Sequence, residues 1–310
     1  MSIPRPSAQK LRRNGILYLP GLALLLALAT GFQTPLHAAG AERAGAKSTF
    51  RAAQYNIRYD APADVKSGNP WETRKDRIAE LILKHDFDIV GTQEGNENQV
   101  EALKKLLPGY DYRGAPYGGK SHKNHTCSIF YKTSRYAALD SGVFWLSETP
   151  DEPSIGWDAT DRRICHWAKF KDIPTGVEFY FFNVHFYWRY VTARQNSGAL
   201  MAEKIKKIAG GSPVICTGDF NSSPSARRLD AVHALLRDAY DVTQTPRKGP
   251  EGTSFPGGVF EGTPGSRIDY IFVSSHFDVL SYAVLTDSYN NGHYPSDHLP
   301  VVCDMAFGKH

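Results

Sequence analysis

Apolar and polar positions follow two periods along this chain, and each period predicts a different kind of element. Nearly continuous apolar runs, which are typical of buried strands, occupy residues 50–57, 88–94, 126–131, 137–146, 163–170, 178–186, 213–221, 267–273, 279–285 and 299–307. Apolar residues at helical spacing, which predict amphipathic helices, occupy residues 74–85, 99–107, 192–209 and 229–236. Strands alternate with helices at the front of the chain and follow one another directly in the middle. This pattern predicts an α/β fold with two sheets packed face to face and the helices outside.

The first 38 residues form a segment of a different character. It starts with the basic residues Arg5, Lys10, Arg12 and Arg13, continues with an apolar stretch over 16–32, and ends in small residues at 38–41. This layout is typical of a secretory signal peptide, cleaved near 38–41. A membrane anchor is the alternative, but Pro20, Gly21 and Gly31 interrupt the apolar stretch. We therefore expect an exported protein, periplasmic or secreted, that keeps no stable membrane anchor.

Removing this segment changes the charge of the chain. The full sequence has 36 basic and 32 acidic residues. Four of the basic residues lie in the first 38 positions, so the remainder has 36 − 4 = 32 basic residues against 32 acidic ones. A neutral chain does not favour coating a polyanion by charge, although a locally positive cleft is compatible with it. Residues 39–310 have the length of one α/β domain, and we expect a monomer.

The four cysteines do not indicate a metal site. Cys127, Cys165, Cys216 and Cys303 are scattered along the chain, mostly within apolar runs, and their spacing matches no metal-binding pattern. Export permits disulfides. We nevertheless predict that all four are small buried side chains.

Candidate site residues recur where the predicted strands end. The run 213–221 ends in Gly-Asp-Phe-Asn, where Asp219 and Asn221 share one face of an extended chain. An Asx turn is the alternative interpretation of this pair. Further polar groups at strand ends are Asn56, Glu94, His185, Asp269 and the pair Asp297 and His298. Strand ends that are distant in sequence can converge on one rim of a sheet, where α/β proteins place their sites.

The residue types in this set suggest phosphate chemistry. Glu94, Asn56 and Asp297 are oxygen ligands suited to Mg²⁺, which is usually held by one or two carboxylates together with substrate phosphate. Asp219 is placed to orient or deprotonate a water, and Asn221 can donate to a phosphoryl oxygen. His298 would then be a general base or a cationic phosphate ligand, with Asp269 supporting its protonated form.

These motifs, taken in order, resemble a known family. They are Asn56, Gln93-Glu94, Asn183-Val184-His185, Gly218-Asp219-Phe220-Asn221, Arg267-Ile268-Asp269-Tyr270-Ile271 and Ser296-Asp297-His298-Leu299-Pro300. Over about residues 50–307 the chain resembles the endonuclease/exonuclease/phosphatase superfamily. The resemblance implies a four-layer α/β/β/α sandwich of two mixed, mainly antiparallel sheets, and a divalent-metal site for Mg²⁺, with Mn²⁺ or Ca²⁺ as alternatives.

The resemblance also implies a role for each of these residues. Glu94 and Asn56 would bind the metal, with Asp297 a further ligand. Asp219 and Asn221 would handle the attacking water and the phosphate. His185 and His298 would contact or protonate the phosphate, and Asp269 would pair with His298.

One run departs from the family pattern. Many bacterial relatives place an acidic residue two positions after the central histidine, where this chain has Tyr187, followed by Trp188 and Arg189. These three side chains could stack on a base or sugar and clamp an anion, or Tyr187 and Trp188 could pack under a loop. Arg163 is a second candidate for holding a phosphate.

We therefore predict a divalent-metal-dependent hydrolase of phosphate esters, a phosphodiesterase or phosphatase, in which an activated water attacks in line. Its substrate would be a small molecule, a lipid headgroup or a nucleic acid, and the neutral charge favours a small or membrane-derived ester over long duplex DNA. A nuclease acting on extracellular DNA or RNA is the first alternative. A non-catalytic module that binds a phosphate ligand is the alternative from a different class.

Overall fold

Two six-stranded sheets form the centre of this computed structural model, which describes residues 48–119, 125–289 and 292–308. The first sheet has the strand order β11 (Phe277–Val284), β12 (Val301–Phe307), β1 (Thr49–Asn56), β2 (Ile89–Gln93), β4 (Thr126–Lys132), β3 (Tyr110–Pro116). The second has the order β5 (Tyr136–Trp145), β6 (Ile164–Asp172), β7 (Glu178–His185), β8 (Val214–Asp219), β10 (Asp269–Val273), β9 (Arg237–Asp238). The predicted signal peptide lies outside the described residues.

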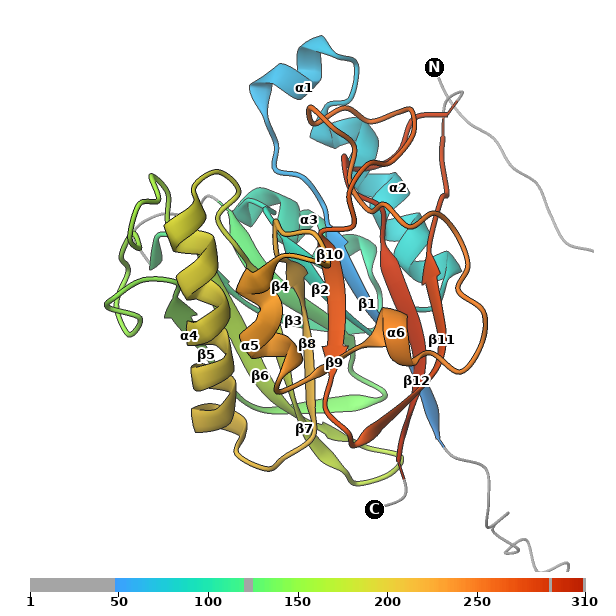
Figure 1. Cartoon of the computed structure of the whole chain (residues 1–310). Helices are drawn as coiled ribbons and strands as arrows, with labels where there is room; N and C mark the ends of the chain where they lie inside the picture. The colour runs from blue at the N-terminus through green and yellow to red at the C-terminus, as the bar shows by residue number, and fades with distance from the viewer. Residues whose placement is uncertain (1–47, 120–124, 290–291, 309–310) are drawn as a thin grey trace, which may run out of the picture. The chain divides into compact units, whose positions relative to one another are not determined.

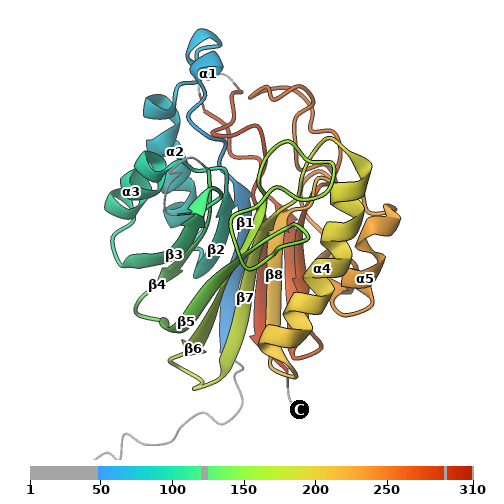
Figure 2. The ribbon, with the colours of Figure 1, turned by 90° about the vertical axis from the view of Figure 1, so that its left-hand side faces the viewer.

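Helices cover the outer face of each sheet (Figures 1 and 2). Helices α2 (Trp71–Lys84) and α3 (Glu97–Leu106) lie on the first sheet, and α4 (Val191–Ala209) and α5 (Asp230–His233) lie on the second. Each pair packs over its own apolar cluster, with Ile78 and Leu103 in one cluster and Met201 and Val232 in the other. The predicted four-layer α/β/β/α sandwich of mixed sheets is therefore confirmed.

The strand directions bring the candidate site residues to one edge of the two sheets. Strands β1 and β2 are parallel, as are β7 and β8, so each pair ends at one edge of its own sheet. The hydrogen bond of 3.1 Å from Asn56, at the end of β1, to Asp219, at the end of β8, shows that these two edges meet. Strand β10 runs antiparallel to β8 and places Asp269 opposite Asp219. Strand β12 runs antiparallel to β1 and starts at this edge, which brings the segment before it, with Asp297 and His298, to the same place.

The inner faces of the sheets change from apolar to polar toward that edge. Phe179, Phe181 and Ile215 belong to the apolar core between the sheets. The next positions on these faces are polar, because side chains on one face recur at every second residue. At this level the sheets approach so closely that a Cβ on Gly91 would overlap the side-chain oxygens of Thr217 and Asn183.

Several elements differ from the sequence-based expectation. Strand β3 was not predicted, since only its first residue is buried and the segment contains no continuous apolar run. The helix expected over 229–236 is reduced to a 3-10 turn (Arg227–Leu229) and the short α5, because the chain then turns into β9. The short helices α1 (Pro62–Lys66) and α6 (Ala239–Val242) were also not predicted.

The predicted state of the cysteines is confirmed, since all four are free and buried. None of the helices in the described part of the chain is both long and apolar enough to cross a membrane.

Candidate active site

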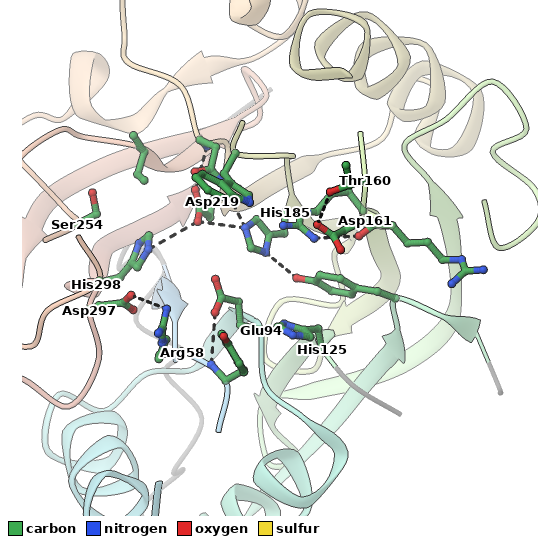
Figure 3. Close-up of a pocket in the computed structure, with 18 of the residues that line it drawn as sticks. Arg58, Glu94, His125, Thr160, Asp161, His185, Asp219, Ser254, Asp297 and His298 are labelled. Carbon is green, nitrogen blue, oxygen red and sulfur yellow. Dashed lines mark hydrogen bonds and ion pairs between the residues drawn. The ribbon is translucent and has the colours of Figure 1, made fainter. Parts of the chain in front are cut away.

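An open pocket of about 900 Å³ lies where the strands end. Its lining includes most of the residues singled out from the sequence: Glu94, Arg163, His185, Trp188, Asp219, Asn221, Asp297 and His298. In Figure 3, Glu94, His185, Asp219 and His298 point toward one common space. The structure therefore brings together groups that lie far apart in the sequence.

Asp219 occupies the centre of this arrangement. Its Oδ1 accepts a hydrogen bond from the backbone amide of Asn221 at 2.9 Å. Its Oδ2 accepts from the Asn56 side-chain amide at 3.1 Å and lies 3.4 Å from His185 Nε2 and 3.8 Å from His298 Nε2. Burial raises the pKa of Asp219 to about 7, although the nearby His298 opposes this shift. The carboxylate is thus suited to exchanging a proton near neutral pH.

His298 belongs to a hydrogen-bonded pair with a buried carboxylate. Its Nδ1 lies 2.8 Å from Asp269 Oδ2, so the predicted pairing of these two residues is present. The Thr253 hydroxyl donates to the same oxygen at 2.6 Å. Burial lowers the pKa of His298, but the charge and hydrogen bond of Asp269 outweigh burial and hold it well above its ordinary value. This imidazole is therefore the cationic one of the pocket.

His185 has a neutral partner instead. The Tyr117 hydroxyl lies 2.7 Å from its Nδ1. Burial, with the nearby Arg163, holds the pKa of His185 well below its ordinary value. Its Nε2 faces a donor, the Asn221 amide nitrogen at 3.2 Å, and an acceptor, Asp219 Oδ2. Tyr117 was not among the candidates from the sequence, because it lies in a segment with no site-like pattern.

Glu94 and Asn56 form the side of the pocket toward β1 and β2. The Asn56 amide nitrogen donates to Glu94 Oε1 at 3.1 Å as well as to Asp219, while its oxygen accepts from the Arg58 backbone amide at 3.0 Å. In this arrangement Asn56 orients both carboxylates as a donor. Burial would raise the pKa of Glu94, but the hydrogen bond from the Asn56 amide and the positive charge of His298 oppose burial and lower that pKa.

The donor atoms of this side fit a divalent cation. Ligand atoms of Glu94, His185 and Asp219 lie within 4.8 Å of one another. Within the described part of the chain, neither lysine nor arginine forms an ion pair with Glu94. A carboxylate without a cationic partner beside a second carboxylate is a suitable oxygen ligand for Mg²⁺ or a similar ion.

Asp297 already has a cationic partner in the pocket. Arg58 Nη1 lies 3.2 Å from Asp297 Oδ2. The same guanidinium bonds both carboxylate oxygens of Asp64, at 3.1 and 3.2 Å. Arg58 was missed in the sequence, although it follows Asn56 by only two residues. A role for Asp297 as a metal ligand stays a prediction, and it requires this ion pair to open or to be shared.

Backbone strain is concentrated at the pocket. Six described residues other than glycine have a positive φ, and four of them line the pocket: Arg58 (56°), Glu94 (68°), His125 (52°) and Asn221 (45°). Such conformations are costly for residues with a Cβ and cluster at functional sites. At Asn221 the unusual backbone accompanies a side-chain bond to the Phe186 carbonyl at 3.0 Å, which aims its amide at His185.

The four residues predicted to contact the substrate separate into two groups. Trp188 lines the pocket with 53% of its surface exposed, and Arg163 lines it as well. Tyr187 is buried and not part of the lining; its hydroxyl lies 2.8 Å from Thr160 Oγ1. Of the two alternatives for Tyr187, packing under a loop describes its position. Arg189 lies over the Trp188 ring, outside the lining.

Comparisons with known proteins agree with this geometry. A structure from Bacteroides thetaiotaomicron, described as an endonuclease/exonuclease/phosphatase family protein, is 40% identical, with a TM-score of 0.80 over 86% of this chain and 100% of that one. The mannosyl-6-phosphatase of the same organism is 40% identical, with a TM-score of 0.78 over 83% of this chain and 100% of that one. Protein L388 of Acanthamoeba polyphaga mimivirus is 31% identical over 75% of this chain and 91% of its own length.

The match to a family covers nearly the whole described region. The profile of the Endonuclease/Exonuclease/phosphatase family matches residues 53–298. These limits enclose every residue that lines the pocket, from Arg58 to His298. The chain therefore belongs to the endonuclease/exonuclease/phosphatase family.

Proposed function

We propose that this protein is a divalent-metal-dependent phosphoesterase in which a water molecule attacks phosphorus in line. The observation that carries the proposal is the position of one Asp219 oxygen between His185 Nε2 and His298 Nε2, with Glu94 facing the same space. Phosphoryl transfer to water needs a proton acceptor for the water and positive charge for the phosphoryl oxygens. This pocket supplies groups of both kinds.

The protein groups divide these tasks by their charge. Asp219, whose pKa is raised to about 7, accepts the proton of the attacking water. His298, kept cationic by Asp269, presents an N–H and a positive charge to a phosphoryl oxygen. The Asn221 amide donates to the Phe186 carbonyl, and its second hydrogen, which faces His185 Nε2, would turn to the phosphate when substrate binds. His185 is neutral and orients the phosphate, or the group that leaves, by hydrogen bonding.

A divalent cation completes this proposal. Mg²⁺ is the first candidate, with Mn²⁺ or Ca²⁺ as alternatives, and it would supply positive charge to the phosphate oxygens. Glu94 would hold it, with Asn56 contributing its oxygen after the amide turns. Asp297 is a further ligand if Arg58 shares it. Substitutions at Glu94, Asn56 and Asp297 would therefore change the affinity for the metal.

For the substrate we propose a small phosphate ester, with phosphorylated sugars as the first class to test. The mannosyl-6-phosphatase that is 40% identical supports this choice. The neutral charge of residues 39–310 also weighs against a polyanionic substrate. The nuclease alternative is supported by the family description, which includes nucleases as well as phosphatases.

A hydrolysis screen under metal control tests the proposal. Sugar phosphates, inositol phosphates, phospholipid headgroups, DNA and RNA are incubated with the protein in Mg²⁺, in chelator, and in chelator followed by excess Mg²⁺ or Mn²⁺. We expect turnover of a small ester that is lost in chelator and restored by metal. The matched control is Asp219→Ala, which we expect to lose at least about a hundredfold in kcat while folded.

Other results of the screen would support a different function. Faster turnover of DNA or RNA than of every small ester would identify a nuclease. Tight binding of a phosphate ligand, without turnover of any substrate, would favour the non-catalytic module. Activity that persists in chelator would contradict the metal requirement.

Export of the mature chain as a monomer is part of the same proposal, supported by the layout of the first 38 residues. Mass spectrometry of the protein from the periplasm or culture medium tests it. An N-terminus near 38–41 is expected, and an intact leader in the cell would contradict it. Light scattering of the mature chain tests the monomer.

A further inference from the structure

A row of side-chain amides crosses from one sheet to the other beneath the pocket. Gln54 on β1 and Gln93 on β2 belong to the first sheet, and Asn183 on β7 belongs to the second. All three are completely buried. The row ends on the carboxylate of Asp269, to which Gln54 Nε2 donates at 3.1 Å. Gln54 was not among the candidate residues from the sequence, although it precedes Asn56 by two positions on the same face of β1.

The hydrogen bonds of Asn183, at the end of the row away from Asp269, fix the direction of every other hydrogen bond in the row. The Asn183 amide nitrogen donates to the backbone carbonyls of Thr92 and Ser128, at 2.8 and 2.9 Å. A carbonyl can only accept, so the Asn183 oxygen must face Gln93. Gln93 Nε2 donates to that oxygen at 2.5 Å and to Gln54 Oε1 at 2.8 Å.

The last amide of the row therefore presents a donor to Asp269. Gln54 Nε2 uses one hydrogen for Gln93 Oε1, at 2.6 Å, and the other for Asp269 Oδ1. Turning the Gln54 amide over would place its oxygen against both the Gln93 oxygen and the Asp269 carboxylate. The cost of an unsatisfied buried acceptor opposes that change. The row has one consistent arrangement.

Asp269 is consequently held from three directions. Gln54 occupies Oδ1, while the Thr253 hydroxyl and His298 Nδ1 share Oδ2. Thr253 Oγ1 itself accepts from the backbone amides of Ile268 and Asp269, at 3.1 and 3.2 Å, so its proton is directed to the carboxylate. Without Gln54, one oxygen of Asp269 would lose a buried donor and the carboxylate would be free to rotate away from His298.

We propose that Gln54 is a positioning residue, which fixes the Asp269 carboxylate and, through it, the His298 ring in the orientation that phosphoester hydrolysis needs. The inference rests on the proposed function, since it concerns the arm that presents His298 to the phosphate. Gln54 touches neither the pocket nor the substrate. Substituting Gln54 should therefore lower kcat and leave substrate binding unchanged.

The test is a kinetic comparison of Gln54→Met, which keeps the side-chain volume and removes the donor, with the wild type. Para-nitrophenyl phosphate and bis(para-nitrophenyl) phosphate are the probes, at saturating Mg²⁺. We expect kcat to fall by about tenfold to a hundredfold, the range for a lost hydrogen bond to a charged group. KM should stay within about twofold, since no contact to the substrate is removed. Tyr110→Phe is the matched control, because it also removes a buried side-chain donor, to the Phe87 carbonyl, outside both the amide row and the pocket lining.

A double-mutant cycle with Asp269→Asn separates positioning from general loosening of the fold. If Gln54 acts through Asp269, adding Gln54→Met to Asp269→Asn costs less than about threefold, because the shared interaction is already lost. Equal losses in both backgrounds, or a kcat unchanged in Gln54→Met, would overturn the proposal. If Gln54→Met does not fold at the assay temperature, Gln93→Met is judged by the same cycle. A wild type inert on both probes and on the full screen contradicts the proposed function itself, whereas an active wild type with an unaffected Gln54→Met contradicts only the positioning role.

Discussion

Two of the three histidines that line the pocket, His185 and His298, are buried and lie within 4 Å of Asp219 Oδ2, at 3.4 and 3.8 Å, yet their charges differ. Asp269 faces Nδ1 of His298 and raises its pKa well above the ordinary value. The neutral hydroxyl of Tyr117 faces Nδ1 of His185, and burial with Arg163 lowers its pKa. Burial alone makes an imidazole neutral, and only a buried carboxylate reverses that effect. The partner of Nδ1 thus decides what each ring can do at Nε2.

A third histidine shows the effect of burial without any such partner. His166 on β6 is 4% exposed and its Nδ1 has no hydrogen-bond partner. Burial, with a smaller contribution from Arg113, lowers the pKa of His166 to about 3. His166 therefore shows what burial alone does to a histidine in this fold, and His185 and His298 can be compared with it.

The largest effect is expected at the cationic histidine. His298→Gln removes the charge that Asp269 maintains, and we expect kcat to fall by at least about a hundredfold, as for a general acid or an oxyanion donor. His293→Gln is the matched control, because His293 precedes the same segment and lies outside the pocket lining. Steady-state kinetics at saturating Mg²⁺ measure both. A loss below about tenfold would mean that His298 is not the charged group on which turnover depends.

The next largest effect is expected at the carboxylate that faces His185 without a cationic partner. Glu94→Gln should raise the Mg²⁺ concentration for half-maximal activity by at least about tenfold, because a charged oxygen ligand becomes neutral. Metal titration of activity, with binding by calorimetry as the second readout, measures the shift. Glu101→Gln, on the outer face of α3, should leave it unchanged. An unshifted titration would show that the metal binds elsewhere.

A smaller effect is expected at the neutral partner of His185. Tyr117→Phe removes the hydroxyl at Nδ1, and a neutral hydrogen bond of this kind corresponds to a loss in kcat of about twofold to tenfold. Tyr110→Phe is the control, since Tyr110 is also buried and donates to the Phe87 carbonyl away from the pocket. If Tyr117→Phe lost as much as His298→Gln, the contrast between the two histidines would fail.

The smallest effect on activity is expected at His166. A substitution there should change the pH dependence of stability. Its pKa in the folded protein, about 3, lies below the unfolded value of about 6.5. The unfolded chain therefore binds more protons as the pH falls below 6.5, so stability is retained above that pH and lost progressively toward pH 3. His166→Leu should reduce this loss by up to about 1.4 kcal/mol per pH unit.

Thermal unfolding between pH 6.5 and pH 4 measures that difference. Tm should fall less steeply with decreasing pH in His166→Leu than in the wild type, by about 2–4 °C per pH unit. His233→Leu, at an exposed position, should leave the slope unchanged. Equal slopes for all three proteins would show that His166 is able to take up a proton within the fold.

Much of the fold follows from local patterns in the sequence. The runs that became β1, β2, β7 and β8 are apolar and close to continuous, because both faces of these strands are covered. Their polar ends, such as Asn56 and Asp219, were visible for the same reason: polar side chains interrupt an apolar pattern. Strand β3 escaped prediction because it lies at a sheet edge and is only partly covered.

The hydrogen-bond and ion-pair partners of these residues could not be predicted from local patterns in the sequence. Tyr117, Arg58 and Gln54 each bond a candidate site residue that is distant in sequence: His185, Asp297 and Asp269. For Tyr187 the sequence left both substrate contact and packing under a loop open; the side chain is buried and its hydroxyl lies 2.8 Å from Thr160 Oγ1.

The sequence by itself determined which strands exist, which faces are buried and which residue types stand at the strand ends, because periodicity and residue chemistry are local properties. The pairing of Asp269 with His298 was expected from the sequence and is present. Only the tertiary structure decided that a neutral tyrosine serves His185 and that Asn56 turns its nitrogen toward Glu94 and Asp219. Those assignments depend on how two sheets pack across a few ångströms. At that distance the identity of one neighbouring atom determines whether a buried group keeps its charge.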